Sequence, residues 1–93
     1  MIWNIQMDKF IDTLNKNKIE FKEVQGKIVI KQKIIRTPSI LYKPLEITID
    51  GSVYKCQFYK MYHNTDSTVI VTKEFVYMNS CIKYIKKYLK GEL

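Results

Sequence analysis

The side chains that could do chemistry are few, and lysine is the most abundant of them. The chain has 93 residues, with 16 Lys and Arg against 9 Asp and Glu and a net charge of +7 at pH 7. Arg36 is the only arginine. A small domain with this charge attracts polyanions such as nucleic acid, an anionic membrane or an acidic protein surface. The alternative explanation is codon usage, because an AT-rich genome supplies lysines that selection did not require.

Two acid-free segments concentrate the positive charge. One is the last predicted helix, where four lysines share a flank and either form a solvated face that complements the helix dipole or bind successive phosphates. The other is residues 24–45, which form a second basic patch. A tyrosine beside a lysine on the outer face of the predicted sheet could stack a base. The predicted nucleic-acid-binding residues are Lys83, Lys86, Lys87, Lys90, Lys31, Lys33, Arg36, Lys43, Lys55 and Tyr59.

Residues for catalysis are sparse. His63 is the only histidine, and Asp66 follows it in the same predicted turn. Residues 20–22 have the Glu-x-Lys form found in metal-dependent nucleases, with Glu23 or Glu46 as candidate second carboxylates. The chain has no glycine-rich phosphate loop and neither the HExxH nor the GxSxG motif. We therefore expect no enzyme, cofactor or metal, and a small metal-independent ribonuclease using His63 remains the alternative.

The cysteines and the hydropathy indicate the compartment. Cys56 and Cys81 are not spaced as a metal or redox pair, and both fall beside apolar positions, so we expect reduced, packed thiols without a metal. No apolar run reaches the roughly 18 residues of a membrane span, and no export signal is visible. The sequence therefore predicts a cytoplasmic protein without a membrane partner.

These side chains must be positioned by a sheet whose centre is residues 45–62. Asp50-Gly51 separates two alternating runs and predicts a two-residue hairpin turn, with Ile47 opposite Tyr54. This pairing gathers apolar residues on one face. They are Leu45, Ile47, Ile49, Tyr54, Cys56 and Phe58.

The flanking segments supply the other elements. Apolar spacing predicts a helix capped by Asn4 and closed near Asn15 and Asn17, then strands over 18–24 and 27–35 around a Gln25-Gly26 turn. Residues 36–44, with two prolines, are predicted as an irregular crossover. A four-residue turn at 63–66 leads to a strand over 67–72 that pairs Phe58 with Val71 and places Val69 and Val71 on the core face. The last helix follows, either capped by Thr72 or delayed to about Asn79, and it stops at Gly91.

The sequence therefore predicts one α+β domain over residues 1–93. Its order is α-β-β-β-β-β-α, a curved antiparallel sheet with the N- and C-terminal helices packed on one face.

The function predicted from these residues is a small, basic, non-enzymatic binding module for nucleic acid or a nucleic-acid-containing complex. The alternative is an inhibitor of the phage or mobile-element type that binds a host nucleic-acid machine, of the anti-CRISPR or anti-restriction class, with Trp3, Ile40 and Tyr42 as anchors. A continuous basic surface favours phosphate as the ligand, whereas an apolar patch ringed by charge favours a protein.

Overall fold

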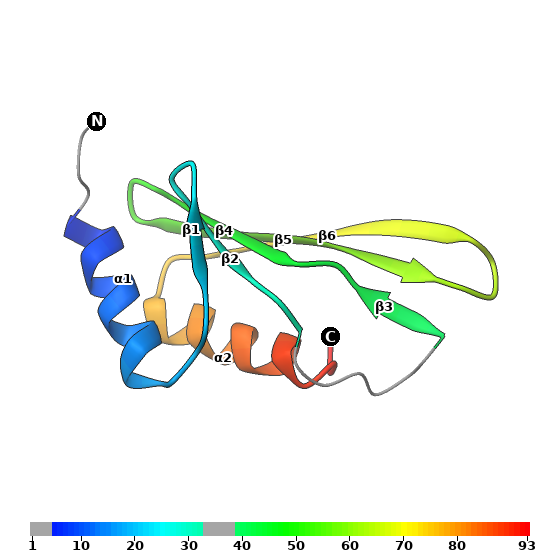
Figure 1. Ribbon diagram of the computed structural model, residues 1–93. Helices are drawn as coiled ribbons and strands as arrows, with labels where there is room; N and C mark the ends of the chain where they lie inside the picture. The colour runs from blue at the N-terminus through cyan, green and yellow to red at the C-terminus, as the bar shows by residue number, and fades with distance from the viewer. Residues whose placement is uncertain (1–4, 33–38) are drawn as a thin grey trace.

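The computed structural model describes residues 5–32 and 39–93, which form two helices and six strands. Every strand pair is antiparallel, and β5 lies at the centre, paired with β3, β4 and β6. The predicted α+β fold is confirmed, with one strand more than the five expected (Figure 1). The elements are α1 (Ile5–Lys16), β1 (Lys22–Val24), β2 (Lys27–Ile30), β3 (Ile40–Tyr42), β4 (Leu45–Asp50), β5 (Val53–Tyr62), β6 (Ser67–Phe75) and α2 (Met78–Leu89).

Both helices pack on the same face of the sheet (Figure 1). The ring of Phe10 in α1 lies 5.4 Å from that of Tyr54 in β5, and Tyr88 in α2 lies 5.1 Å from Phe58. Tyr54 and Phe58 are four residues apart in one strand and therefore point to the same face. The fully buried side chains of this core are Phe10, Leu14, Ile28, Ile30, Leu45, Ile47, Cys56, Phe58, Cys81, Ile85 and Tyr88.

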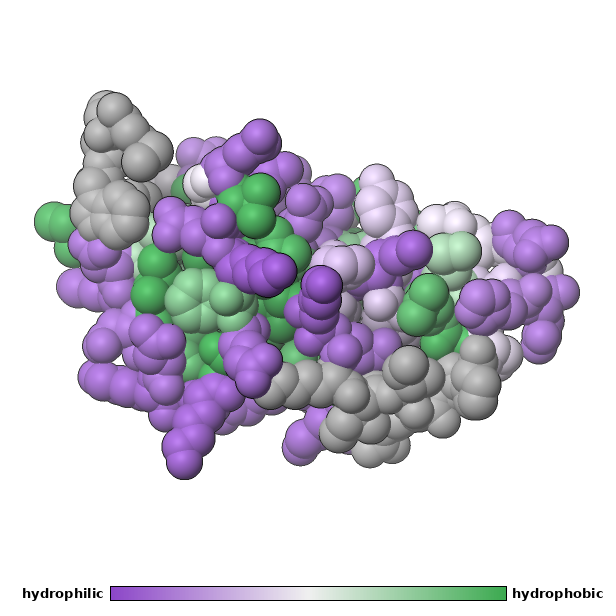
Figure 2. All heavy atoms as spheres, viewed as in Figure 1, coloured by the Kyte–Doolittle hydropathy of each residue, from purple (hydrophilic) through white to green (hydrophobic). Residues whose placement is uncertain are grey.

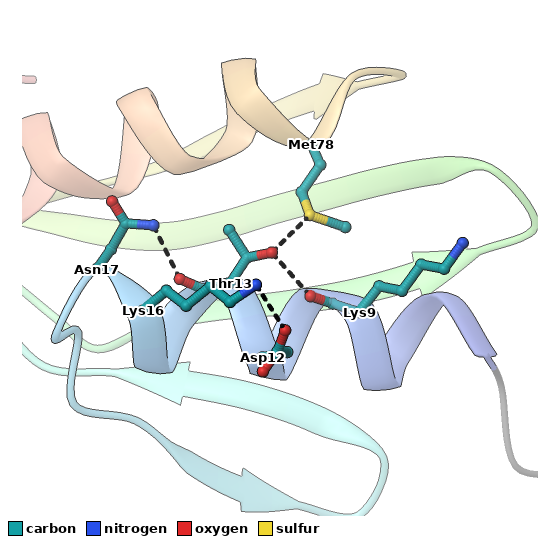
Figure 3. Close-up of polar contacts among 6 residues, drawn as sticks. All are labelled: Lys9, Asp12, Thr13, Lys16, Asn17 and Met78. Atoms are coloured by element: carbon teal, nitrogen blue, oxygen red, sulfur yellow. Dashed lines mark hydrogen bonds and ion pairs between the residues drawn. The ribbon is translucent and has the colours of Figure 1, made fainter.

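Helix α1 buries its apolar stripe of Met7, Phe10 and Leu14 and contacts α2 through Thr13. The Thr13 hydroxyl donates to the Lys9 carbonyl at 2.8 Å and lies 3.2 Å from Met78 Sδ at the start of α2 (Figure 3). The helix ends at Lys16, near Asn15 and Asn17 as predicted, but the left-handed residue that closes it is Lys18, with φ of 56°, and not an asparagine. The amide of Ile19 bonds to the Leu14 carbonyl at 2.9 Å, which is the hydrogen bond of a Schellman motif. The Asn4 cap lies outside the described residues.

The first hairpin has the predicted turn but shorter strands. Val24 pairs with Lys27, and the loop residues Gln25 and Gly26 have φ of 51° and 78°, as a type I′ turn requires. Strand β1 begins only at Lys22, because the chain is still turning out of α1 at Lys18.

The central hairpin forms with a different register from the one predicted. Asp50 pairs with Val53, so the loop is Gly51-Ser52, and Ile47 pairs with Cys56 and not with Tyr54. Gly51 has φ of 62° and is the only residue of this turn with positive φ, the pattern of a type II′ turn. The pairing differs by two residues from the prediction, which leaves every side chain on its predicted face.

The segment predicted as an irregular crossover contains strand β3. Ile40 pairs with Tyr62 and Tyr42 with Lys60, at the end of β5 that β4 does not reach. Tyr42 packs against Phe58 at 5.3 Å and is buried. The open edge of β5 therefore recruits the β-prone residues Ile40–Tyr42 in spite of the flanking prolines.

The last hairpin and α2 follow the delayed alternative. Phe58 pairs with Val71 as predicted, but β6 continues to Phe75 and α2 begins at Met78, so the predicted Thr72 cap is wrong. Aromatic and β-branched residues at 75–77 favour the extended chain. Val69 lies on the predicted face but is 47% exposed. Figure 1 shows the reason, since the β5–β6 hairpin extends beyond α2.

Candidate nucleic-acid interface

Helix α2 presents its predicted lysines to solvent because its opposite side is anchored in the core. Tyr88, which sequence spacing places on a flank, is fully buried, and its hydroxyl donates to the Lys43 carbonyl at 2.7 Å. Gly91, with φ of 69°, ends the helix as predicted, and the amide of Glu92 bonds to the Lys87 carbonyl at 2.9 Å. The exposed lysines are Lys83, Lys86, Lys87 and Lys90.

Two of these lysines reach a groove between α2 and β6. Lys83 and Lys87 line it from the helix, and Lys73 lines it from the strand. The groove has a volume of about 530 Å³, and none of the described residues that line it is acidic. Lys73, Lys83 and Lys87 also have no carboxylate within 4.0 Å in the part of the chain that the structure describes. The remaining lining residues are Val71, Thr72, Phe75, Ser80, Tyr84 and Leu93.

Aromatic and hydroxyl side chains complete this α2–β6 groove. The half-buried rings of Phe75 and Tyr84 lie 5.2 Å apart with an interplanar angle of 56°. Ser80 adds a hydroxyl-bearing residue to the lining, whereas Thr72 pairs with Gln57 and its side chain points to the opposite face of the sheet. The groove therefore combines cations, hydrogen-bond donors and π-faces, the combination on which single-stranded nucleic acids are bound.

Sequence reasoning missed Lys73. The predicted helix start with a Thr72 cap placed this residue in the first turn of a helix, and only the delayed start left it in the strand. Lys73 lies in β6, where it pairs with Cys56 of β5 and so shares the helix-bearing face. The sequence signal for Lys73 is its position between Val71 and Phe75, because alternate residues of a strand share one face. This signal places Lys73 on the helix-bearing face only if the strand continues to Phe75.

Two thiols that lie 25 residues apart in the sequence meet in the core. Cys56 Sγ and Cys81 Sγ are 3.6 Å apart, free and fully buried, and their predicted apolar surroundings are confirmed. The hydrogen bond to Cys81 and burial both raise the pKa of Cys56. Burial, with the nearby Cys56 and Cys81 thiols and Tyr42, raises the pKa of Tyr84 to about 12. The Tyr84 hydroxyl is buried and has no hydrogen-bond partner among the described residues.

The second predicted patch does not join the α2–β6 groove. Lys31 is exposed and lines a hollow with Glu20 and Lys22, whereas Lys43 lines a different hollow beside Tyr59. Lys33 and Arg36 lie outside the described residues.

The outer face of the sheet has balanced charge. Lys55 is exposed but faces Glu74 across the strands, and Lys27 lies 3.8 Å from Glu46. Tyr59 is 43% exposed and lines a mainly apolar hollow of about 520 Å³. The predicted basic track with an aromatic is therefore absent from the described part of this face. The residues lining the Tyr59 hollow are Val29, Lys43, Pro44, Glu46, Tyr59, Met61 and Thr68.

The residues predicted to anchor a protein partner, Trp3, Ile40 and Tyr42, do not form one exposed patch among the described residues. Tyr42 is only 9% exposed and belongs to the core, where Lys60 Nζ lies 5.4 Å above its ring. Ile40 is half-buried in β3, and Trp3 lies outside the described residues. Exposed apolar atoms occur elsewhere, and Figure 2 shows some between hydrophilic side chains over α1 and the β1–β2 end.

The candidate catalytic residues lie at separate places. His63 is exposed in the β5–β6 turn together with Asp66, whose φ is 51°. Glu20 and Lys22 lie at the hollow beside Lys31, and Glu46 is paired with Lys27 on the outer face. Across residues 5–32 and 39–93, no three His, Cys, Asp or Glu side chains gather closely enough to hold a metal ion.

Neither described helix has the length and apolar character needed to cross a membrane. Comparisons with protein-family models, curated proteins and solved structures gave no match to this chain.

Proposed function

We propose that the protein is a non-enzymatic module that binds single-stranded nucleic acid in the α2–β6 groove. The observation that carries this proposal is the convergence of Lys73, Lys83 and Lys87 on one groove that also contains the rings of Phe75 and Tyr84. None of the side chains that line the groove is acidic, so its lysines attract phosphate, whereas the outer face is charge-balanced.

The chemistry of this groove favours binding without sequence preference. Each lysine ammonium acts as a point charge on a phosphate and carries no base information. Phe75 and Tyr84 offer π-faces to bases, and stacking contributes about 1–3 kcal/mol per base with any base type. Lys86 and Lys90, exposed on the same helix, extend the positive field beyond the groove.

A salt titration on a mixed-sequence single-stranded oligonucleotide tests the proposal. Three neutralised phosphates give a log–log slope of affinity against salt near −2 for a single strand. Lys83→Gln or Lys87→Gln should each reduce the magnitude of this slope by about 0.7 and weaken all sequences alike. Lys55→Gln is the matched control, because Lys55 is exposed on the opposite face and should leave the slope unchanged.

Two results would contradict the proposal of nucleic-acid binding in the α2–β6 groove. If no oligonucleotide binds more tightly than ~100 μM at 50 mM salt, the affinity is below ordinary non-specific binding and the proposal fails. If Lys55→Gln lowers the slope as much as Lys83→Gln, the α2–β6 groove is not the binding site.

A second candidate function rests on the Tyr59 hollow. An apolar hollow with one cation and one anion at its rim, Lys43 and Glu46, suits an anchor from a protein partner. In this case the chain is an inhibitor of the phage or mobile-element type that binds a host nucleic-acid machine. A pull-down from a nuclease-treated extract should then recover one partner. Tyr59→Ala should abolish its capture while Lys83→Gln has little effect.

The proposal of a non-enzymatic protein is tested with labelled RNA and DNA, with and without Mg²⁺. We expect no turnover. Turnover that is abolished by His63→Ala would replace the proposal with the ribonuclease alternative.

We also propose a cytoplasmic location, since Cys56 and Cys81 are free although their sulfurs are only 3.6 Å apart. Reduced thiols are usual in a reducing compartment. Fractionation of the source cells tests this.

A further inference from the structure

Strand β6 leaves a long, unprotected edge of the sheet. In the described part of the chain β6 pairs only with β5, so the backbone groups along its other edge have no strand partner. Natural edge strands are usually short or carry charge or proline. The other strands with an open edge are short, since β1 and β3 have three residues each and two of those in β1 are charged, whereas Ser67–Thr72 has six residues without charge, proline or glycine. Val69 and Ile70 are 47% and 51% exposed on this edge.

The sequence of this edge reads the same in both directions. Residues 68–72 are Thr-Val-Ile-Val-Thr, centred on Ile70. In an antiparallel pair related by a two-fold axis at Ile70, threonine lies opposite threonine, valine opposite valine, and Ile70 opposite the same residue of the second copy. Thr–Thr and β-branched cross-strand pairs are favourable pairings in sheets.

From this arrangement we infer that β6 is a homodimer interface, in which two copies join their sheets edge to edge through residues 67–73. Such an isologous contact closes on itself and leaves no further β6 edge exposed. A two-fold axis perpendicular to the sheet keeps α2 of both copies on one face, so both α2–β6 grooves open on the same side.

Within residues 67–73 charge does not oppose this register, and the unfavourable pair of Glu74 with Asp66 of the second copy lies at the end of the strand, where Asp66 is already in the turn. Lys73 lies opposite Ser67 of the second copy, so no charged side chain of residues 67–73 faces another charged side chain. The two Lys73 residues are six positions apart along the paired strands, about 20 Å, which exceeds the Debye length at physiological salt. A register that is not centred on Ile70 loses the like-with-like pairing of residues 68–72.

The test is the mass in solution as a function of protein concentration, measured by light scattering after gel filtration. Wild-type protein should shift from one-chain to two-chain mass as its concentration rises. Ile70→Lys places two ammonium groups face to face at the axis and should weaken dimerisation at least about tenfold. Val24→Lys is the matched control, because Val24 is 47% exposed on the edge strand β1 and should leave the dimer intact.

Charge reversal supplies the decisive measurement. An equimolar mixture of Ile70→Lys and Ile70→Glu chains should recover the two-chain mass, because opposite charges then meet at the axis. In wild-type protein, amide hydrogen exchange over residues 67–73 should slow as concentration rises, a readout that needs no variant.

Three results would overturn the inference. If the wild-type protein keeps its one-chain mass at every concentration and amide exchange at β6 does not change, the homodimer does not form. The β6 edge is then available to a strand of a different protein. A two-chain mass that persists in Ile70→Lys, or that is lost equally in Val24→Lys, places the contact elsewhere. A mixture of the two Ile70 variants that stays at one-chain mass excludes the two-fold register. None of these results depends on nucleic-acid binding in the α2–β6 groove.

Discussion

Replacing Tyr88 by phenylalanine tests how α2 is held against the sheet. Tyr88 is fully buried, its ring contacts those of Phe58 and Tyr42, and its hydroxyl donates to the Lys43 carbonyl at 2.7 Å. Tyr88→Phe keeps the ring contacts and removes only the hydroxyl. Loss of the buried hydrogen bonds of this hydroxyl, to the Lys43 carbonyl and from the Gln32 and Leu45 backbone, should lower the free energy of unfolding by about 1.5 kcal/mol at pH 7. For a domain of this size the melting temperature should fall by about 6–12 °C.

The destabilising effect of the same variant should disappear at high pH. Burial raises the pKa of Tyr88 to about 12 from 10.0, and backbone hydrogen bonds from Gln32 and Leu45 limit the rise. The unfolded chain therefore releases this proton at lower pH than the folded chain. The stability contributed by neutral Tyr88 is complete below pH 10 and is lost between pH 10 and 12. At pH 11 the wild type should have lost about 1.4 kcal/mol that Tyr88→Phe does not lose.

Urea unfolding followed by circular dichroism at pH 7 and pH 11 measures both effects. The deficit of Tyr88→Phe should shrink from about 1.5 kcal/mol at pH 7 to nearly zero at pH 11. Tyr84→Phe is the matched control, because the Tyr84 hydroxyl has no hydrogen-bond partner among the described residues. That variant should be within ~0.5 kcal/mol of the wild type at pH 7, and it should be the more stable protein at pH 11, since burial also raises the pKa of Tyr84 to about 12.

Two results would refute this reasoning. If Tyr88→Phe is as stable as the wild type at pH 7, the hydroxyl does not hold α2 against the sheet. If its deficit is the same at both pH values, the proton of Tyr88 is not retained in the folded state above pH 10.

Three further predictions concern the turns and the thiols. Gly51→Val should destabilise the protein by ~1 kcal/mol or more in urea unfolding because φ at Gly51 is 62°, whereas Ser52→Val, at a position without positive φ, should cost less. Gly91→Ala should lower the free energy of unfolding by about 1 kcal/mol, because φ at this position at the end of α2 is 69°. An unchanged melting temperature would show that the left-handed residue at the end of α2 does not contribute to stability. Cys56 and Cys81 should resist iodoacetamide in the folded protein because both are buried and the pKa of Cys56 is raised, and they should react in urea; a two-dalton mass loss without reductant would contradict the free thiols.

Much of the fold could be read from local patterns. The alternation around Gly51 sorted the β4 and β5 side chains onto the faces on which they lie, and the helical stripe of Met7, Phe10 and Leu14 is buried. The 63–66 turn and the Phe58–Val71 pair also follow from local spacing. Such features succeed because burial on one face of an element imposes its own period on the sequence.

Register and the extent of strands could not be read in this way. A shift of two residues keeps every β4 and β5 side chain on its face, so alternation cannot distinguish Ile47 opposite Tyr54 from Ile47 opposite Cys56. Strand β3 exists because β5 is longer than β4 and offers its remaining edge to Ile40–Tyr42. These outcomes depend on neighbouring strands that are distant in the sequence.

The residues of the candidate site also differ in whether local sequence spacing or tertiary structure places them. Sequence alone determined that Lys83 and Lys87 are exposed on one side of an amphipathic helix, since local spacing fixes a helix face. Tertiary structure decided that Lys73 joins them across the α2–β6 groove, because pairing with β5 carries β6 through to Phe75. It also decided that Lys55 and Tyr59 lie on the opposite face from this groove, since only the packing of both helices on one side of the sheet defines which strand residues share a surface with α2.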